Sequence, residues 1–182
     1  MRKLQQRQLT LPIKYGSGDT RGRITSYKRE TRMKMAIGSD SVHHLTDAIS
    51  AYLEGKGVTL VRCGALAGKT ADYVDAAREV AEKVAAGECE QGLIFCWTGT
   101  GVTIIANKVP GVRAALCVDS FSAKIARLAN NANIVVLGIR LTGEPHAREI
   151  VDTWLETQPS TEPRRVNFHR KTDDLDAAYR RA

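Results

Sequence analysis

Cys96 stands at the end of a short apolar run, and a turn with two glycines follows it directly. The run is GLIFC (92–96), and the turn is WTGTG (97–101). Gly99 and Gly101 let the backbone turn tightly and aim several amide N–H groups at one point, just before a helix begins. Such a nest of amides binds a phosphate or a developing oxyanion. Its positive field favours a thiolate, and a thiolate beside an oxyanion hole can move a proton alpha to a carbonyl.

A structural role for the cysteine is the competing interpretation. Cys96 would then end a core strand as a small hydrophobic residue, which is the role we expect for Cys63, Cys89 and Cys117. The four cysteines form no CxxC pair and no Cys/His spacing typical of a metal site. We therefore expect neither a disulfide framework nor a bound metal or other cofactor, and a reducing cytoplasm as the location.

Two other glycine-containing stretches resemble nucleotide-binding motifs without matching them. Gly99 and Gly101 begin a G-x-G-x-x-G pattern, but residue 104 is isoleucine and the motif follows the third apolar run instead of the first. The stretch GALAGKT (64–70) is one residue short of the P-loop spacing. Neither stretch therefore supports a dinucleotide site or an ATPase.

The elements that must hold these residues alternate between buried strands and amphipathic helices. Five apolar runs rich in Val, Ile and Leu lack in/out alternation, as strands covered on both faces should; they are 34–38, 58–63, 92–96, 112–117 and 133–138. Helical spacing covers residues 44–57, 72–88, 102–109, 120–131 and 144–156. Asp72 and Ser120 are expected to cap helices, and Gly55 and Gly87 to end them. The pattern predicts one α/β domain with a Rossmann-like, doubly wound, parallel five-stranded sheet.

In such a sheet, ligands bind outside the carboxyl ends of the strands. Four of these ends carry polar or reactive residues: GSDS (38–41), Cys63-Gly64, the turn after Cys96, and VDS (118–120). The third carries the strongest chemistry.

The net charge of +7 does not indicate a nucleic-acid-binding domain. Residues 1–32 carry all of the excess, with nine basic and two acidic side chains, and the rest of the chain is neutral. We interpret 1–32 as a basic flexible N-terminal extension, either an organelle transit segment or an upstream segment before Met33. No apolar run is long enough for a membrane span. Nucleic acid and membrane are therefore not expected partners.

The chain resembles the ribose-5-phosphate isomerase B / galactose-6-phosphate isomerase family over about residues 33–158. The resemblance rests on MKMAIGSD (33–40), Asp72-Tyr73, CWTGTGVTIIANKVPGVRAALC (96–117) and NNANIVVLG (130–138). It implies a metal-free aldose–ketose isomerase with a small-molecule sugar phosphate as substrate. It also implies a homodimer or homotetramer with active sites shared between subunits, and residues 159–182 as a C-terminal arm or helix that contacts a partner subunit.

The resemblance also implies roles for individual residues. Cys96 would be the base that moves a proton between C1 and C2 through a cis-enediolate, assisted by Thr98. The amides of Trp97, Gly99, Thr100 and Gly101 would stabilise the enediolate. Further substrate contacts would come from Asp40, Ser41, Tyr73 and Asn130, and the phosphate would be bound by Arg164 and Arg165, with Arg170 as a further candidate.

Three departures from the family pattern bear on the substrate. Ser41 stands where the family usually has histidine, Trp97 where it has glycine, and Ala129 where it has the histidine that opens the cyclic sugar. His43 or His44 could supply a replacement imidazole.

These departures leave the substrate open. Ribose 5-phosphate is the default, and an acyclic tetrose 4-phosphate, which needs no ring opening, is the alternative. The chain could also be the cysteine-bearing subunit of a galactose-6-phosphate isomerase. In a different class, it could be a sugar-phosphate-binding protein that has lost activity.

Overall fold

Five short buried runs pair side by side as parallel strands. In the computed structural model, which describes residues 33–179, they are β1 (Lys34–Ser39), β2 (Thr59–Gly64), β3 (Gln91–Cys96), β4 (Ala114–Leu116) and β5 (Ile134–Gly138). Their order in the sheet is β2-β1-β3-β5-β4. This is the single Rossmann-like α/β domain that the sequence predicts. The predicted extension of residues 1–32 lies outside the described residues.

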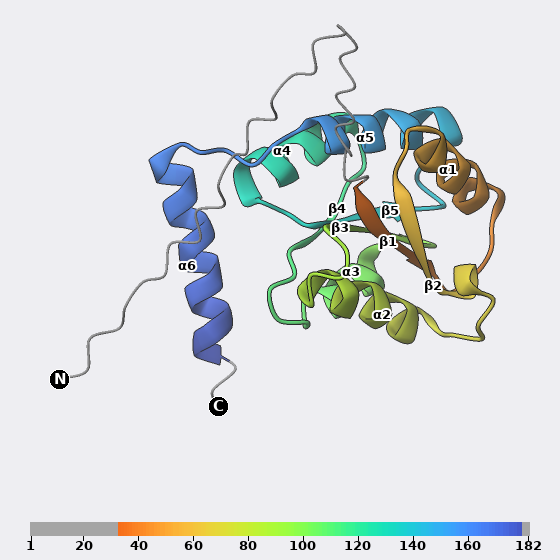
Figure 1. The fold of residues 1–182 in the computed structure, drawn as a ribbon, viewed down its shortest axis with the longest axis horizontal. Coiled ribbons are helices and arrows are strands. Elements are labelled where there is room, and N and C mark those ends of the chain that lie inside the picture. Colours follow the sequence, from red (N-terminus) through yellow and green to blue (C-terminus); the bar gives the residue numbers. More distant parts are fainter. Residues whose placement is uncertain (1–32, 180–182) are drawn as a thin grey trace, which may run out of the picture. The chain divides into compact units, whose positions relative to one another are not determined.

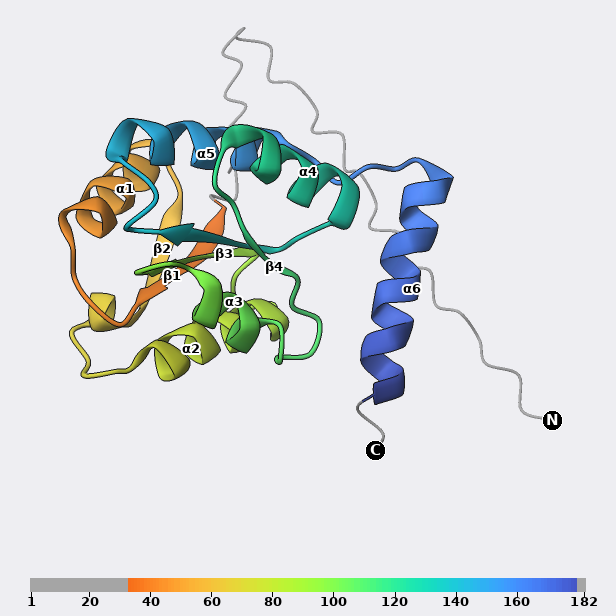
Figure 2. The ribbon, with the colours of Figure 1, turned by 180° about the vertical axis from the view of Figure 1, so that it is seen from behind.

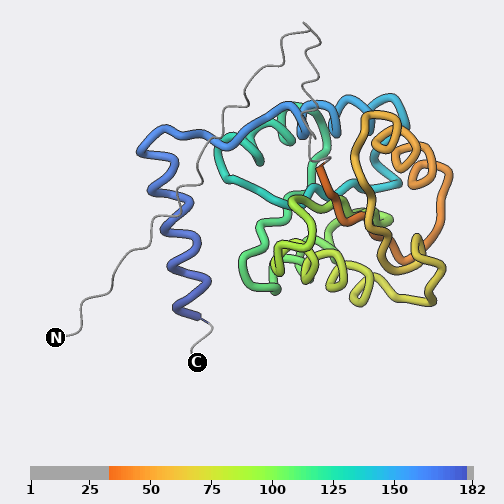
Figure 3. The backbone as a smooth tube through the Cα atoms, viewed as in Figure 1, coloured from red at the N-terminus to blue at the C-terminus, as the bar shows by residue number. Residues whose placement is uncertain are grey.

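Helices cover both faces of the sheet (Figures 1 and 2). On one face lie α1 (His44–Gly55), α4 (Ser120–Asn130) and α5 (Glu144–Glu156), and on the other lie α2 (Tyr73–Ala85) and α3 (Thr100–Ala106). A 3-10 turn, η1 (Ala65–Ala67), follows β2, and α6 (Pro163–Tyr179) ends the described chain. Figure 3 shows how the backbone returns through a helix or turn before each new strand. Among residues 33–179, no helix is long and apolar enough to cross a bilayer.

The strands are apolar on both faces because each face meets a helical layer. Ile37 and Phe95 point into the core beneath α1, α4 and α5, whereas Ala36 and Ile94 point into the core over α2 and α3. Successive side chains of a strand point to opposite faces, so both sets must be apolar. This double burial explains why the runs show no in/out alternation.

Helix ends were predicted with mixed success. The Asp72 carboxylate caps α2 as expected, accepting from the amides of Val74 and Asp75. The assignment of Ser120 as a cap is wrong, because the preceding residue, Asp119, has the extended backbone of a cap and accepts from the Ser122 amide. A carboxylate is the stronger acceptor at a helix N-terminus, and Ser120 becomes the first helical residue.

The third helix and the fourth strand have bounds that differ from the prediction. The third helix begins at Thr100 and ends at Ala106, instead of spanning 102–109, because the turn after Cys96 passes straight into it. β4 covers only residues 114–116 instead of 112–117. It is an edge strand with one partner, β5, and its buried flanks at Val112 and Cys117 lie outside the paired register.

The P-loop-like stretch 64–70 is organised by a glutamate. The Gly64 amide donates to Glu79 Oε2 at 3.0 Å, and Lys69 Nζ lies 2.7 Å from Glu79 Oε1. Burial opposes ionisation of Glu79, but the hydrogen bonds from Lys69 and Gly64 outweigh it and lower the pKa of this carboxyl. The lysine and the amide that a phosphate would use are thus paired with an anion.

The turn from β3 into α3 depends on one glycine. Gly99 has φ of +82°, in the left-handed region that residues with a side chain rarely adopt. A Cβ atom placed there would lie 2.5 Å from Leu116 Cδ1 and 3.2 Å from Val136 Cγ1. The turn is therefore pressed against the ends of β4 and β5 and accepts no side chain.

Gly99→Ala is expected to destabilise the fold by roughly 2–4 kcal/mol, since it combines a positive φ with a clash against core side chains. Gly57→Ala is the matched control. Gly57 also has positive φ (+87°) but has no atom within 4 Å of an added Cβ, so only the backbone cost of about 1 kcal/mol applies. Urea denaturation of both variants measures the difference. Equal losses would show that the packing of this turn is not tight.

The four cysteines differ sharply in their environment. Cys63, Cys89 and Cys117 are buried, whereas Cys96 is partly accessible at the carboxyl end of β3. Burial raises the pKa of the Cys63 and Cys117 thiols to about 12, and it also raises that of Cys89. At pH 8, on the order of 1 in 10,000 of the two most perturbed thiols is ionised.

We expect iodoacetamide at pH 8 to alkylate Cys96 first, with the three core cysteines labelled only after local or global unfolding. Peptide mass spectrometry over time measures the four rates separately. Cys96→Ser should leave almost no labelling under native conditions and three labelled sites in denaturant. Labelling of Cys63 or Cys117 as fast as Cys96 would contradict this account of the core.

Candidate active site

The carboxyl end of β3 carries the partly accessible thiol of Cys96 and the amide-rich turn. Cys96 pairs with Gly138 of β5, and its side chain packs against the core over α2 and α3 while remaining partly accessible. The Ile139 amide donates to the Cys96 carbonyl at 2.8 Å, and the Arg140 amide to the Trp97 carbonyl at 3.0 Å. These bonds fix the turn against the end of β5. The first amides of α3 have no intrahelical partner and remain available for an anion.

Two hydroxyl groups flank this turn. Thr98 Oγ1 and Thr100 Oγ1 lie 2.9 Å apart, and both residues are exposed. A hydroxyl can donate or accept, so this pair can follow a change of charge on a substrate oxygen.

The predicted contacts on β1 and α2 gather at the same edge of the sheet. Gly38 of β1 pairs with Ile94 of β3, so Asp40 and Cys96 emerge two residues later from adjacent strands. Ser41 Oγ donates to Asp40 Oδ1 at 3.3 Å, and both residues are exposed. Tyr73, the first residue of α2, is 45% exposed, and its ring lies against Gly101, where an added Cβ would be 3.1 Å from Tyr73 Cε2.

This gathering follows from the topology of the sheet. β1 lies between β2 and β3 in the sheet. The chain passes from β1 to β2 through α1 and then crosses back over β1 through α2 to reach β3. A parallel sheet opens a crevice where the connections diverge in this way, outside the carboxyl ends of the two central strands. Asp40 on one side and Cys96 on the other border that crevice.

Arg140 is a residue of this edge that the sequence reasoning missed. It follows β5, is exposed, and places its guanidinium carbon 5.7 Å from the centre of the Trp97 ring. Trp97 is itself 59% exposed. A cation two residues beyond a strand end is the signal that could have identified Arg140, since β5 lies next to β3.

Asn130 lies near the amino ends of the strands, opposite the carboxyl ends that carry Cys96 in the same chain. It is the last residue of α4, and the chain then turns at Asn131 (φ +48°) to begin β5. The Gly92 amide donates to the Asn133 carbonyl, which places this segment at the amino end of β3. Cys96 stands at the other end of that six-residue strand, roughly 16 Å away at about 3.3 Å per residue.

The predicted phosphate-binding arginines lie on α6. Arg164 places its guanidinium 5.6 Å from the ring centre of Phe168, and Arg165 Nε lies 3.5 Å from Glu162 Oε2. Arg170 pairs with Asp174 on the same helix.

A cavity of about 330 Å³ opens where α6 meets the ends of α4 and β4; its lining includes Arg113, Ala129, Asn130, Phe168, His169 and Thr172. Sequence reasoning missed His169, whose Nε2 lies 2.8 Å from the Ala129 carbonyl.

The two histidines suggested as replacements lie at the start of α1. His43 caps this helix, and its Nδ1 accepts from the Leu45 amide at 3.2 Å. The His44 ring lies 4.1 Å from the His43 ring between centroids, tilted by 44°, and His44 is exposed. The capping role occupies the acceptor nitrogen of His43. Within residues 33–179, no group of three His, Cys, Asp or Glu side chains is arranged to hold a metal ion.

Comparison with known proteins identifies the family. Residues 35–170 match the family model described as Ribose/Galactose Isomerase. The chain is 39% identical to ribose-5-phosphate isomerase B of Escherichia coli, over 69% of this chain and 85% of the relative. It is also 39% identical to a D-erythrulose-4-phosphate isomerase of Pectobacterium atrosepticum, over 69% of this chain and 84% of the relative.

Solved structures agree with this assignment. Ribose-5-phosphate isomerase B of Clostridium thermocellum superposes with a TM-score of 0.75 at 39% identity, covering 81% of this chain and 99% of that one. Type B ribose 5-phosphate isomerase of Trypanosoma brucei gives a TM-score of 0.73 at 40% identity, covering 79% and 99%. With its parallel sheet and its thiol beside a glycine turn, the chain belongs to the ribose/galactose isomerase family of sugar-phosphate aldose–ketose isomerases.

Proposed function

We propose that this chain interconverts ribose 5-phosphate and ribulose 5-phosphate through a cis-enediolate. The observation that carries the proposal is the partly accessible Cys96 beside the Gly99 turn, bordered by Asp40 and Tyr73. The Cys96 thiolate takes the proton from C2 of the open aldose, and the electrons move onto the carbonyl oxygen at C1. The same thiol returns the proton to C1 as the carbonyl forms at C2.

The turn supplies the electrostatic part of this reaction. Negative charge develops on the two sugar oxygens, and the free amides between Trp97 and Gly101 stabilise it. The paired hydroxyls of Thr98 and Thr100 assist the transfer of the hydroxyl proton from O2 to O1. No redox or metal chemistry is required, because the hydrogen moves as a proton.

A complete site needs residues from two copies of the chain. Asn130 and α6 lie at the opposite edge of the sheet from Cys96, so in this proposal one copy supplies the thiol and another supplies Asn130, Arg164 and Arg165. A two-fold symmetric dimer would form two such sites, and a tetramer four. Several exposed apolar side chains of α6 support contact with another subunit: Val166, Phe168, Leu175 and Tyr179.

Arg140 completes the phosphate contacts in this proposal. It lies on the edge that carries Cys96, whereas Arg164 and Arg165 would approach from the other subunit. An arginine can hold two phosphate oxygens at once, so cations from two sides would orient the sugar between them.

An acyclic tetrose 4-phosphate is the second candidate substrate. Its phosphate occupies the hydroxyl that would close a five-membered ring, so no ring-opening step is needed. Ala129 and the bulky Trp97 ring at the site favour this shorter substrate. Relatives at 39% and 38% identity are named D-erythrulose-4-phosphate isomerase and 4-deoxy-4-sulfo-D-erythrose isomerase.

The reaction can be tested directly by incubating the protein with ribose 5-phosphate, erythrose 4-phosphate or galactose 6-phosphate in deuterium oxide. NMR then follows exchange at C2. We expect exchange with ribose 5-phosphate, and Cys96→Ser should lower it by about 10²–10⁴-fold because the base is lost. Cys89→Ala, which removes a buried thiol at the other end of β3, is the control and should retain activity.

Each other outcome identifies an alternative. Exchange with the tetrose alone supports the shorter substrate, and exchange with galactose 6-phosphate supports a galactose-6-phosphate isomerase subunit. Binding without any exchange supports an inactive sugar-phosphate-binding protein. Full activity of Cys96→Ser would show that another group is the base.

Trp97→Gly is expected to change substrate preference. Removing the exposed ring lengthens the space beside Cys96, so kcat/KM for ribose 5-phosphate relative to erythrose 4-phosphate should rise by about tenfold. Steady-state kinetics with both sugars measures the ratio. An unchanged ratio would mean that the Trp97 ring does not limit the length of the substrate.

A further inference from the structure

The cavity beside α6 contains His169, and the hydrogen bond of one ring nitrogen shows which nitrogen carries the proton. His169 is half-buried, and its Nε2 lies 2.8 Å from the Ala129 carbonyl oxygen. A backbone carbonyl can only accept, so Nε2 carries the proton of this hydrogen bond. In the neutral imidazole the lone pair then lies on Nδ1, which can take up and return a proton.

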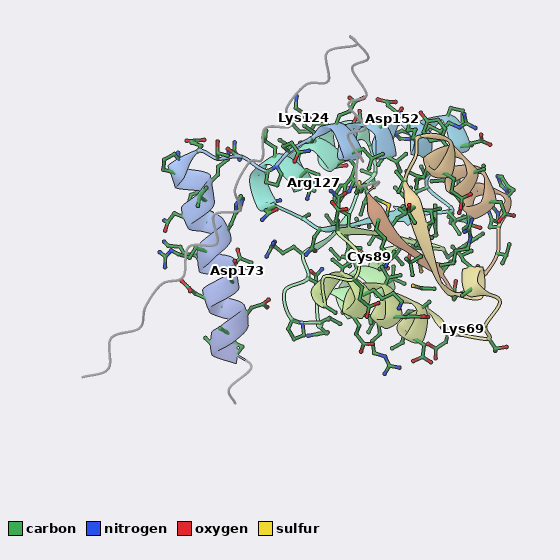
Figure 4. The ribbon with its side chains drawn as sticks, viewed as in Figure 1. Lys69, Cys89, Lys124, Arg127, Asp152 and Asp173 are labelled. Atoms are coloured by element: carbon green, nitrogen blue, oxygen red, sulfur yellow. The ribbon has the colours of Figure 1, made fainter. Side chains whose placement is uncertain are left out.

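Polar contacts on the C-terminal side of His169 hold α6 in place. Arg113 Nε donates to the Asn131 carbonyl, and its Nη1 pairs with Asp173 of α6 at 2.7 Å. One turn further along the helix, the Gly111 amide donates to Asp176 Oδ2 at 3.2 Å. Figure 4 labels Asp173 on the helix. His169 is therefore positioned relative to Asn130, which lines the same cavity.

The other three histidines of the chain are placed differently. The acceptor nitrogen of His43 caps α1, and His44 is exposed beside it. His146 lies in the first turn of α5, which follows the carboxyl end of β5. His169 is the one histidine in the cavity with Asn130 and Ala129.

We propose that His169 opens the furanose ring of ribose 5-phosphate. Nδ1 takes the proton from the O1 hydroxyl, a carbonyl forms between C1 and O1, and the bond between C1 and the ring oxygen breaks. The same nitrogen returns the proton to that oxygen, so the imidazole ends the step unchanged. This inference rests on the proposed function, because the ring is brought to His169 only when a second copy supplies Cys96. It gives the chain an imidazole at the position that Ala129 leaves without one.

The test uses His169→Gln, whose amide can still donate to the Ala129 carbonyl but cannot carry a proton between two oxygens. Turnover of ribose 5-phosphate should fall by about 10²-fold or more, while turnover of erythrose 4-phosphate stays within about twofold. The second substrate shows that the variant is folded and that its base is intact. His146→Gln is the control and should alter neither rate. Adding Ala129→His to His169→Gln should restore ribose 5-phosphate turnover at least tenfold.

Ring opening can also be measured apart from isomerisation. Cys96→Ser should still accelerate interconversion of the two ribose 5-phosphate anomers, followed by NMR exchange spectroscopy with ¹³C at C1. The double variant Cys96→Ser, His169→Gln should not accelerate this interconversion.

The possible failures are distinguishable. Unchanged ribose 5-phosphate turnover in His169→Gln, or an equal loss with both sugars, would overturn the role of His169 while leaving the proposed isomerase in place. Turnover of the tetrose alone by the wild-type protein would overturn ring opening and would support erythrose 4-phosphate as the substrate. Wild-type protein that isomerises neither sugar would overturn the proposed function itself.

Discussion

The left-handed turn at Gly99 is the constraint on which the site depends. It lets β3 pass into α3 within three residues, and it is pressed against Leu116 and Val136 so closely that no side chain fits there. The amides of the turn therefore point outward at a fixed place, next to the last residue of the strand. Cys96, the last residue of β3, is partly exposed beside this turn, whereas the other three thiols are buried.

The parallel sheet places the remaining site residues at two ends, the carboxyl ends and the amino ends of its strands. Asp40, Tyr73, Cys96 and Arg140 lie with the carboxyl ends of the strands, because each follows a strand or begins a helix there. Asn130 and the residues of α6 lie with the amino ends, because α4 runs back along the sheet before β5 begins. One chain therefore separates the proton-transfer group from the groups proposed to hold and open the sugar. In the proposed mechanism, a second copy of the chain brings these two sets of groups together.

Much of this arrangement could be predicted from the sequence, because burial on both faces leaves a distinctive pattern. Short continuous apolar runs such as GLIFC are typical of strands between two helical layers, and the Asp72 cap and the glycine turn are local signals. Signals that depend on a neighbour were less reliable. Ser120 lost its capping role to Asp119 one residue earlier, and β4 was shortened because it lies at the sheet edge. His169 gave no signal, since α6 has no buried face and its partner Ala129 lies forty residues away.

The attachment of α6 has a consequence for how the protein responds to its surroundings. This helix buries none of its residues, and an ion pair and hydrogen bonds between His169 and Asp176 join it to the rest of the domain. Dissolved salt screens the contacts made by the Asp173 and Asp176 carboxylates but leaves the apolar contacts between sheet and helices nearly unaffected. A rise in ionic strength would therefore loosen the segment that carries His169 and the arginines long before it weakens the sheet. In the proposed site, the affinity for a sugar phosphate would then vary with ionic strength while the stability of the sheet stays nearly constant.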